Sequence, residues 1–191
     1  MENKGIDRLS GGDFEKITAE ALAIESDCGS IDWARYGVKM SFQQGKYRPI
    51  HSMPDFEGVI APGGRQFVFD CKVSSGPSLK MDKVKSHQMS FMLGREARGA
   101  ICFLFVHFNA RELKTKSEPP ETYAIPVATT LDLWYAWARG EFDSISRSAA
   151  EEHGIAVPWV KAEGKRKYRP NMLEAINGCR DVLDGRSGYV L

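Results

Sequence analysis

Two acidic residues and a lysine are the side chains in this sequence best placed to do chemistry. Asp55 opens an apolar segment, and Asp70 and Lys72 stand two residues apart in the next apolar segment. A turn signal at 62–64 separates the segments, so a hairpin would bring the two carboxylates together. Because side chains alternate between the faces of a strand, Asp70 and Lys72 share one face. The spacing predicts two carboxylates and one ammonium group at one end of a small sheet.

These groups together are suited to metal-dependent hydrolysis of phosphate esters. Two adjacent carboxylates repel each other, and each raises the pKa of the other. A hard divalent cation relieves the repulsion, because Mg²⁺ prefers oxygen ligands. Such an ion can activate a coordinated water and stabilise charge on a phosphate, while the ammonium group orients the water or neutralises the transition state. We therefore expect Mg²⁺ as cofactor, with Mn²⁺ as an alternative.

Each part of the pattern also has a structural interpretation. Pro-Asp is a common turn dipeptide, and an alternating strand often presents Asp and Lys to solvent. The combination favours the nuclease interpretation, because the carboxylates fall on facing strands and a buried apolar strand follows. Glu57 would share the face of Asp55, and it is either a reserve metal ligand or a surface residue.

Hydrophobic periodicity predicts the elements that must position these groups. Helices are expected over 11–25, 83–95 with Asp82 as its cap, 130–139 and 171–184. Strands are expected over 36–43, 56–61, 65–73, 100–108 and 123–127. Loops are expected over 44–54, 74–81 and 110–122, and 140–170 is either irregular or an appended arm. The unbroken apolar run 100–108 is expected as a buried central strand. The order predicts an α/β domain with a central mixed sheet flanked by helices.

Length and composition are those of an ordinary globular domain. The chain has 191 residues, 42% of them apolar and 27% charged, which fits one nuclease domain over 1–191. Its core is expected at about 10–140, with a C-terminal basic arm and helix over about 141–191. The N-terminus is polar, unlike a signal peptide, and no apolar run approaches the roughly 20 residues of a membrane span. No glycine-rich phosphate loop occurs, so no nucleotide cofactor is expected.

The four cysteines indicate the compartment. Cys28, Cys71, Cys102 and Cys179 are widely spaced, with no CxxC pair and no histidine at zinc-like spacing. They are interpreted as reduced thiols of a cytoplasmic protein. Cys71 and Cys102 fall in expected strands and are interpreted as small core residues.

Positive charge is concentrated in a few short segments. The formal net charge is only +1, so a grip on DNA must come from local clusters. One cluster lies at 161–169, and a looser one consists of Arg35, Lys39, Lys46 and Arg48. The order Lys-Tyr-Arg-Pro occurs in both segments. The candidate phosphate contacts are Lys46, Arg48, Lys165, Arg166 and Lys167, and solvated loops are the competing interpretation.

The order of the motifs resembles the PD-(D/E)xK nuclease superfamily. Its signature is matched by Pro54-Asp55 followed by Asp70-Cys71-Lys72. Upstream, Gly11-Gly12-Asp13-Phe14-Glu15 looks like the G-x-x-x-E helix start of Holliday-junction resolvases. Downstream, Ser86-His87-Gln88 and Gly99-Ala100-Ile101-Cys102-Phe103 are similar to the H-Q segment and G-x-C-F strand of RecU-like resolvases. The resemblance covers about residues 10–108.

The resemblance implies a restriction-endonuclease-like core and a role for each matching residue. Asp55 and Asp70 would bind the metal directly, and Glu15 would complete the metal site or hold a water there. Lys72 would be the catalytic lysine, and Gln88 would support the site from the next helix.

The sequence also departs from the RecU-like pattern in three places. Asp70 stands where the relatives usually carry Glu, and Pro54 stands where they usually carry Thr. A short stretch over 43–53 stands where the relatives have a longer stalk. This difference is expected to affect recognition of junctions more than cleavage.

The expected function is a structure-selective, metal-dependent endodeoxyribonuclease. A Holliday-junction resolvase of recombination or repair fits best, acting on branched or duplex DNA as a homodimer, because a junction has two strands to cut. The alternatives are another restriction- or repair-type nuclease of the superfamily, a DNA-binding module without activity, and a purely structural α/β protein.

Overall fold

A six-stranded mixed sheet forms the centre of the protein. The computed structural model describes residues 6–36, 40–43, 45–49, 53–141, 143–162 and 167–187. The strand order is β1-β4-β5-β7-β10-β12. The strands are β1 (Ile31–Arg35), β4 (Phe56–Ile60), β5 (Arg65–Ser74), β7 (Ile101–Phe108), β10 (Glu121–Pro126) and β12 (Ile155–Ala156). β5 and β7 run parallel, and the other neighbouring pairs run antiparallel.

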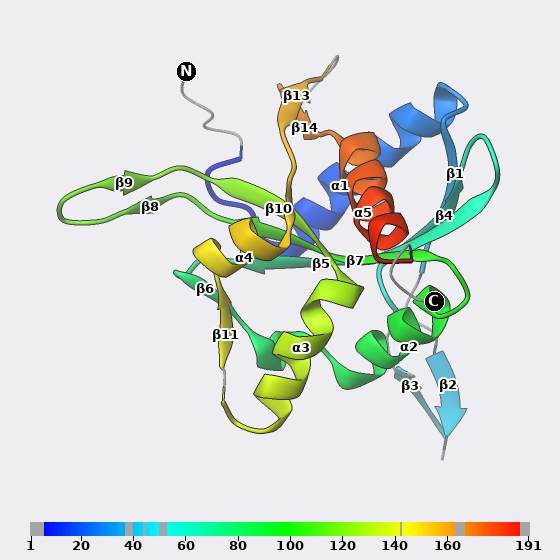
Figure 1. Cartoon of the computed structure of the whole chain (residues 1–191), viewed down its shortest axis with the longest axis horizontal. Coiled ribbons are helices and arrows are strands. Elements are labelled where there is room, and N and C mark those ends of the chain that lie inside the picture. Colours follow the sequence, from blue (N-terminus) through cyan, green and yellow to red (C-terminus); the bar gives the residue numbers. More distant parts are fainter. Residues whose placement is uncertain are drawn as a thin grey trace.

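Helices cover both faces of this sheet. Helices α1 (Gly11–Asp27) and α5 (Met172–Ser187) lie on one face, and α2 (Ser86–Glu96) and α3 (Val127–Ala138) lie on the other (Figure 1). Each face has its own buried cluster, the first containing Phe14 and Ile176 and the second containing Met89. The expected central mixed sheet flanked by helices is thus confirmed, with β7 buried along its whole length.

Alternation along β5 decides which groups point to which cluster. Phe67 and Phe69 belong to the α1 cluster, where Phe69 stacks on Phe103 with ring centroids 4.8 Å apart. Val68 belongs to the α2 cluster, and Asp70 lies fully buried on the same side of the strand. The face assignment predicted for this strand is therefore confirmed, and it buries a carboxylate beneath α2.

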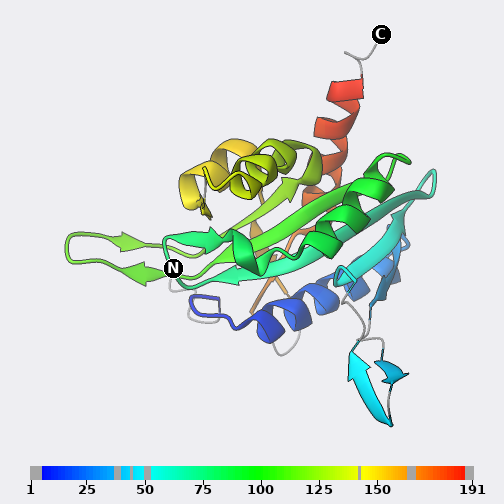
Figure 2. The ribbon, with the colours of Figure 1, turned by 90° about the horizontal axis from the view of Figure 1, so that it is seen from below.

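Short elements complete the described chain. Four two-stranded pairs are formed by β2 (Met40–Gln43) with β3 (Lys46–Pro49), β6 (Ser78–Lys80) with β11 (Ser144–Ser146), β8 (Arg111–Glu112) with β9 (Ser117–Glu118), and β13 (Trp159–Lys161) with β14 (Tyr168–Pro170). A 3-10 turn (Met81–Lys83) precedes α2, and α4 (Arg147–His153) precedes β12. The β2–β3 and β8–β9 hairpins project from the body (Figure 2). In the part of the chain that is described, no helix combines the length and apolar character needed to cross a membrane.

Several expected boundaries were wrong. Of the strand expected over 36–43, β2 covers residues 40–43, and residues 37–39 lie outside the described residues. β1 precedes this stretch and was not expected, and the described part of the loop expected over 44–54 contains β3. The loop expected over 74–81 contains β6, whose Leu79 is fully buried. Asp82 does not cap α2, which begins at Ser86.

The remaining corrections concern the second half of the chain. The loop expected over 110–122 contains β8 and β9, and β10 begins inside it. The segment 140–170 is not irregular, because β11, α4, β12, β13 and β14 lie there. These four strands are two or three residues long. β11 and β12 pair with strands remote in sequence, and β13 and β14 pair with each other across a loop. Hydrogen bonds to distant partners stabilise such elements, so local pattern does not reveal them.

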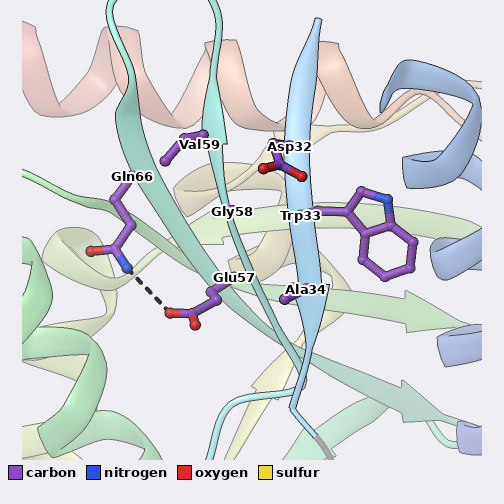
Figure 3. Close-up of a pocket in the computed structure, with 7 residues that line it drawn as sticks. All are labelled: Asp32, Trp33, Ala34, Glu57, Gly58, Val59 and Gln66. Carbon is purple, nitrogen blue, oxygen red and sulfur yellow. Dashed lines mark hydrogen bonds between the residues drawn. The ribbon is translucent and has the colours of Figure 1, made fainter. Parts of the chain in front are cut away.

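Gly58 allows β1 to pack against β4. A Cβ atom there would lie 2.2 Å from the Asp32 carbonyl oxygen and 2.4 Å from the Phe67 ring. Figure 3 shows Gly58 between the neighbouring strands, in the wall of a surface pocket of about 270 Å³. Only a glycine fits without moving one of these groups.

Gly58→Ala should therefore destabilise the fold by about 1–3 kcal/mol, the usual cost of overpacking a tight site. Urea unfolding measures the effect. Gly94→Ala is the control, because its nearest neighbour would be an arginine side chain at 3.6 Å and alanine is favoured inside a helix. Equal stability of Gly58→Ala and the native protein would contradict the close packing of β1.

Candidate active site

Asp55 stands immediately before β4 and is held by two backbone groups. Its main-chain carbonyl accepts a hydrogen bond from the Tyr36 N–H (2.9 Å), and its Oδ2 accepts one from the Cys71 N–H (2.8 Å). In the β4–β5 register Phe56 faces Phe69, so extending it by one residue sets Asp55 opposite Asp70. The hairpin expected from the turn at 62–64 therefore brings the two carboxylates together.

Asp70 is the centre of a network of polar side chains. Its Oδ1 accepts a hydrogen bond from Gln88 Nε2 at 2.7 Å, and its Oδ2 accepts one from Lys72 Nζ. Gln88 lies in the first turn of α2, and its Oε1 is 3.5 Å from Lys72 Nζ. Both Asp70 and Gln88 are buried. The start of α2 thus holds the carboxylate and the ammonium group from its own face of the sheet.

The electrostatics of the pair favour a bound cation. Burial and the charge of Asp70 raise the pKa of Asp55 to about 6, although the Cys71 N–H and Lys72 oppose the shift. Burial also raises the pKa of Asp70, against the lowering effect of Lys72. One ammonium group therefore does not compensate the buried carboxylate of Asp70 and the partly buried carboxylate of Asp55. An added positive charge would stabilise their ionised forms.

Glu15 approaches this network from α1. Its carboxylate pairs with the guanidinium of Arg35, the last residue of β1. Its negative charge makes a minor contribution to the raised pKa of Asp70. Arg35 was not among the site residues expected from the sequence. It lies on a strand that was not predicted, and only its inclusion in a loose basic cluster marked it.

The donor atoms suit a hard divalent cation. In the described ranges, no group of three or more His, Cys, Asp or Glu side chains is arranged to hold a metal ion. Asp55 and Asp70 nevertheless offer carboxylate oxygens side by side, while Glu15 is engaged by Arg35. Mg²⁺ keeps several of its waters and is commonly bound by one or two carboxylates together with substrate phosphates. The residues present therefore fit such an ion.

The other candidates lie outside this network. Glu57 accepts a hydrogen bond from Gln66 (3.2 Å) and lines the surface pocket shown in Figure 3. Lys46 is exposed in β3 and Lys167 is exposed just before β14. The side chain of Arg48 is not described, and Lys165 and Arg166 lie outside the described residues.

Comparison with known proteins gives one family match. A model of the family described as recombination protein U, RecU, matches residues 36–171. No curated protein matches the chain. Among solved structures, the chain is similar to a 1.6 Å structure of Hjc, described as a Holliday junction resolvase of Archaeoglobus fulgidus, an archaeal hyperthermophile. The identity is 14%, the TM-score is 0.44, and the match covers 74% of this chain and 94% of that one.

Proposed function

This chain belongs to the RecU family of recombination proteins, and on that basis we propose that it resolves Holliday junctions. It would act as an endonuclease that hydrolyses phosphodiester bonds in branched DNA. The observation that carries the proposal is the meeting of four polar residues from β5, α2 and the start of β4. They are Asp55, Asp70, Lys72 and Gln88, and Asp70 and Gln88 are buried.

The metal site of this proposal uses the carboxylates. Asp55 and Asp70 would bind Mg²⁺ directly, with Mn²⁺ as a substitute, and Glu15 would complete the site. When bound, the ion would lower the pKa of a coordinated water and stabilise negative charge on the phosphate. Gln88 would keep the Asp70 carboxylate facing the site, through the 2.7 Å hydrogen bond that it donates.

Lys72 would act on the reacting phosphate. Its ammonium group is paired with Asp70 and its side chain is 14% exposed, so it is positioned at the edge of the buried network. From there it would orient the attacking water or compensate the charge that builds on the phosphate oxygens. A preorganised charge is effective at such a place, because little solvent screens it.

The proposal is tested by incubating the purified protein with labelled four-way junction, linear duplex and single-stranded DNA. Each substrate is offered with Mg²⁺, with Mn²⁺ and with a chelator. Symmetric cleavage of the junction that depends on the divalent ion is expected. Cleavage of duplex with no preference for the junction would instead indicate a restriction- or repair-type nuclease. Absence of cleavage on every substrate would contradict the proposal that the protein is an endonuclease.

Two basic segments are proposed to hold the DNA. Each phosphate contact releases counterions, so losing one should flatten the slope of log affinity against log salt by about 0.9. Replacing Lys165, Arg166 and Lys167 with Ala should reduce the slope by nearly three units, at about 0.9 for each contact. Lys46→Ala with Arg48→Ala should weaken junction binding more than duplex binding, if the β2–β3 hairpin enters the branch point.

Salt titrations in Ca²⁺, which prevents cutting, measure both effects. Unchanged slopes and affinities in both variants would contradict these contacts.

Domain organisation and assembly complete the proposal. We propose a single nuclease domain, because elements after residue 140 join the same sheet: β12 pairs with β10, and α5 packs over the α1 cluster. A homodimer would present two sites for the two strands to be cut. Cytoplasmic location remains a prediction. It agrees with the four free cysteines, of which Cys71, Cys102 and Cys179 are buried.

A further inference from the structure

Arg35 of β1 contacts residues of β4 and α1 next to the candidate active site. It ends β1, and in the sheet register it faces Phe56, the residue directly after Asp55. Its guanidinium lies over the Phe56 ring, with 5.8 Å from Cζ to the ring centroid. The same guanidinium pairs with Glu15 of α1. A cation is therefore fixed between Glu15 and the start of β4, the strand that Asp55 directly precedes.

The Arg35–Glu15 pair is poorly suited to a purely stabilising role. The side chain of Arg35 is 49% exposed and that of Glu15 is 27% exposed. Ion pairs this accessible are screened by water and salt, and they contribute little to folding. An arginine at such a place keeps donors available to solvent, because its planar fork has five N–H groups.

The same features suit recognition of a phosphate diester. Guanidinium groups bind phosphate oxygens through two parallel hydrogen bonds, which a lysine cannot reproduce. The Phe56 ring beneath the guanidinium limits its orientation, so less rotational freedom is lost on binding. The guanidinium is also the more exposed partner of its ion pair, so a DNA backbone bound beside Asp55 could contact it.

We propose that Arg35 is a phosphate-binding residue that holds Glu15 away from the metal site until DNA arrives. In the free protein the guanidinium pairs with Glu15. When a phosphate diester takes the guanidinium, Glu15 is released toward Asp55 and Asp70 and completes the site there. The inference rests on the proposed function, and it adds a reason why the divalent ion and DNA should bind cooperatively.

Cooperativity of this kind is reciprocal. If DNA strengthens binding of the ion by releasing Glu15, the ion must strengthen binding of DNA by the same factor. Removing Arg35 should therefore produce a protein whose ion affinity no longer depends on DNA. This property separates the proposal from a simple surface ion pair, which would leave the two affinities independent.

The first experiment measures Mn²⁺ binding by calorimetry without DNA. Arg35→Ala should bind Mn²⁺ at least about fivefold more tightly than the native protein. Fivefold is about the smallest change in affinity that is typical of two coupled binding sites. Losing a nearby positive charge could raise affinity by itself, so the double variant Arg35→Ala with Glu15→Gln is included. The gain should disappear in the double variant if release of Glu15 is its cause. A gain that persists there would overturn the holding role.

Arg65→Ala is the matched control. Arg65 also forms a partly exposed ion pair, with Asp184 at 2.7 Å. It is far from the candidate site, because it begins β5 seven residues before Lys72, which is roughly 23 Å along the strand. It should leave Mn²⁺ affinity unchanged. Arg35→Gln removes the charge and keeps a long polar side chain, and it replaces Arg35→Ala should the alanine variant fail to fold.

The second experiment measures junction binding against salt concentration in Ca²⁺. Arg35→Ala should reduce the slope by about 0.9, the value for one lost phosphate contact, and Arg65→Ala should not. An unchanged slope would overturn the phosphate contact. Failure of the native protein to bind any DNA would overturn the proposed function and the phosphate contact together. The Mn²⁺ affinities of the single and double variants would still decide whether Arg35 holds Glu15.

Discussion

Asp70→Asn is expected to abolish DNA cleavage while junction binding stays as tight or becomes tighter. Asp70 is fully buried, and its two oxygens accept from Gln88 and Lys72. Asparagine removes the charge that would bind Mg²⁺ and offers an N–H₂ group where an acceptor is needed. DNA binding should not suffer, because the lost negative charge repels phosphate. Asp55→Asn should behave in the same way, since Asp55 is the partner carboxylate.

Cleavage is followed on labelled four-way junction in Mg²⁺, and binding is followed in Ca²⁺. Glu57→Gln is the matched control, because Glu57 comes from the same hairpin but is hydrogen-bonded to Gln66 at its surface. It removes one carboxylate charge and should leave cleavage intact. Cleavage at the native rate by both the Asp55 and the Asp70 variants would refute the assignment of the site.

Lys72→Ala is expected to slow cleavage by roughly 10²–10³-fold, the scale for losing one transition-state contact. The ion should still bind, because both carboxylates remain. Lys72→Arg should restore only part of the rate, since a planar fork differs from a compact ammonium group. It also has to fit beside Gln88, whose Oε1 lies 3.5 Å from the Nζ atom.

Single-turnover rates at saturating protein separate this effect from weaker DNA binding. Lys80→Ala is the control, because it removes the same charge from an exposed position in β6. Its single-turnover rate should match that of the native protein. A native rate for Lys72→Ala would show that the lysine is only a surface residue.

The local pattern of the sequence was sufficient to predict the strands at the centre of the sheet. β5 alternates Phe67 and Phe69 with Val68 and Asp70, and alternation is a property of an extended chain alone. The turn at 62–64 and the run 100–108 follow from equally local rules. For this reason the facing of Asp55 and Asp70, and the burial of β7, could be predicted before the structure was known.

Elements that depend on distant partners could not be predicted in this way. β1 forms because Gly58 lets it approach β4, and β6 forms because β11 pairs with it from more than 60 residues away. The second half of the chain was misjudged for the same reason, since its short strands have weak patterns of their own.

The sequence by itself determined which groups could do chemistry and which strand face carries them, because side-chain type and alternation are local properties. The resemblance placed Gln88 near the site, but only the tertiary structure decided that it donates to Asp70, and that Arg35 engages Glu15 across β1 and α1. Those contacts depend on how helices pack on the two faces of the sheet. That packing is set by burial of apolar surface over the whole domain, and no short stretch of sequence contains it.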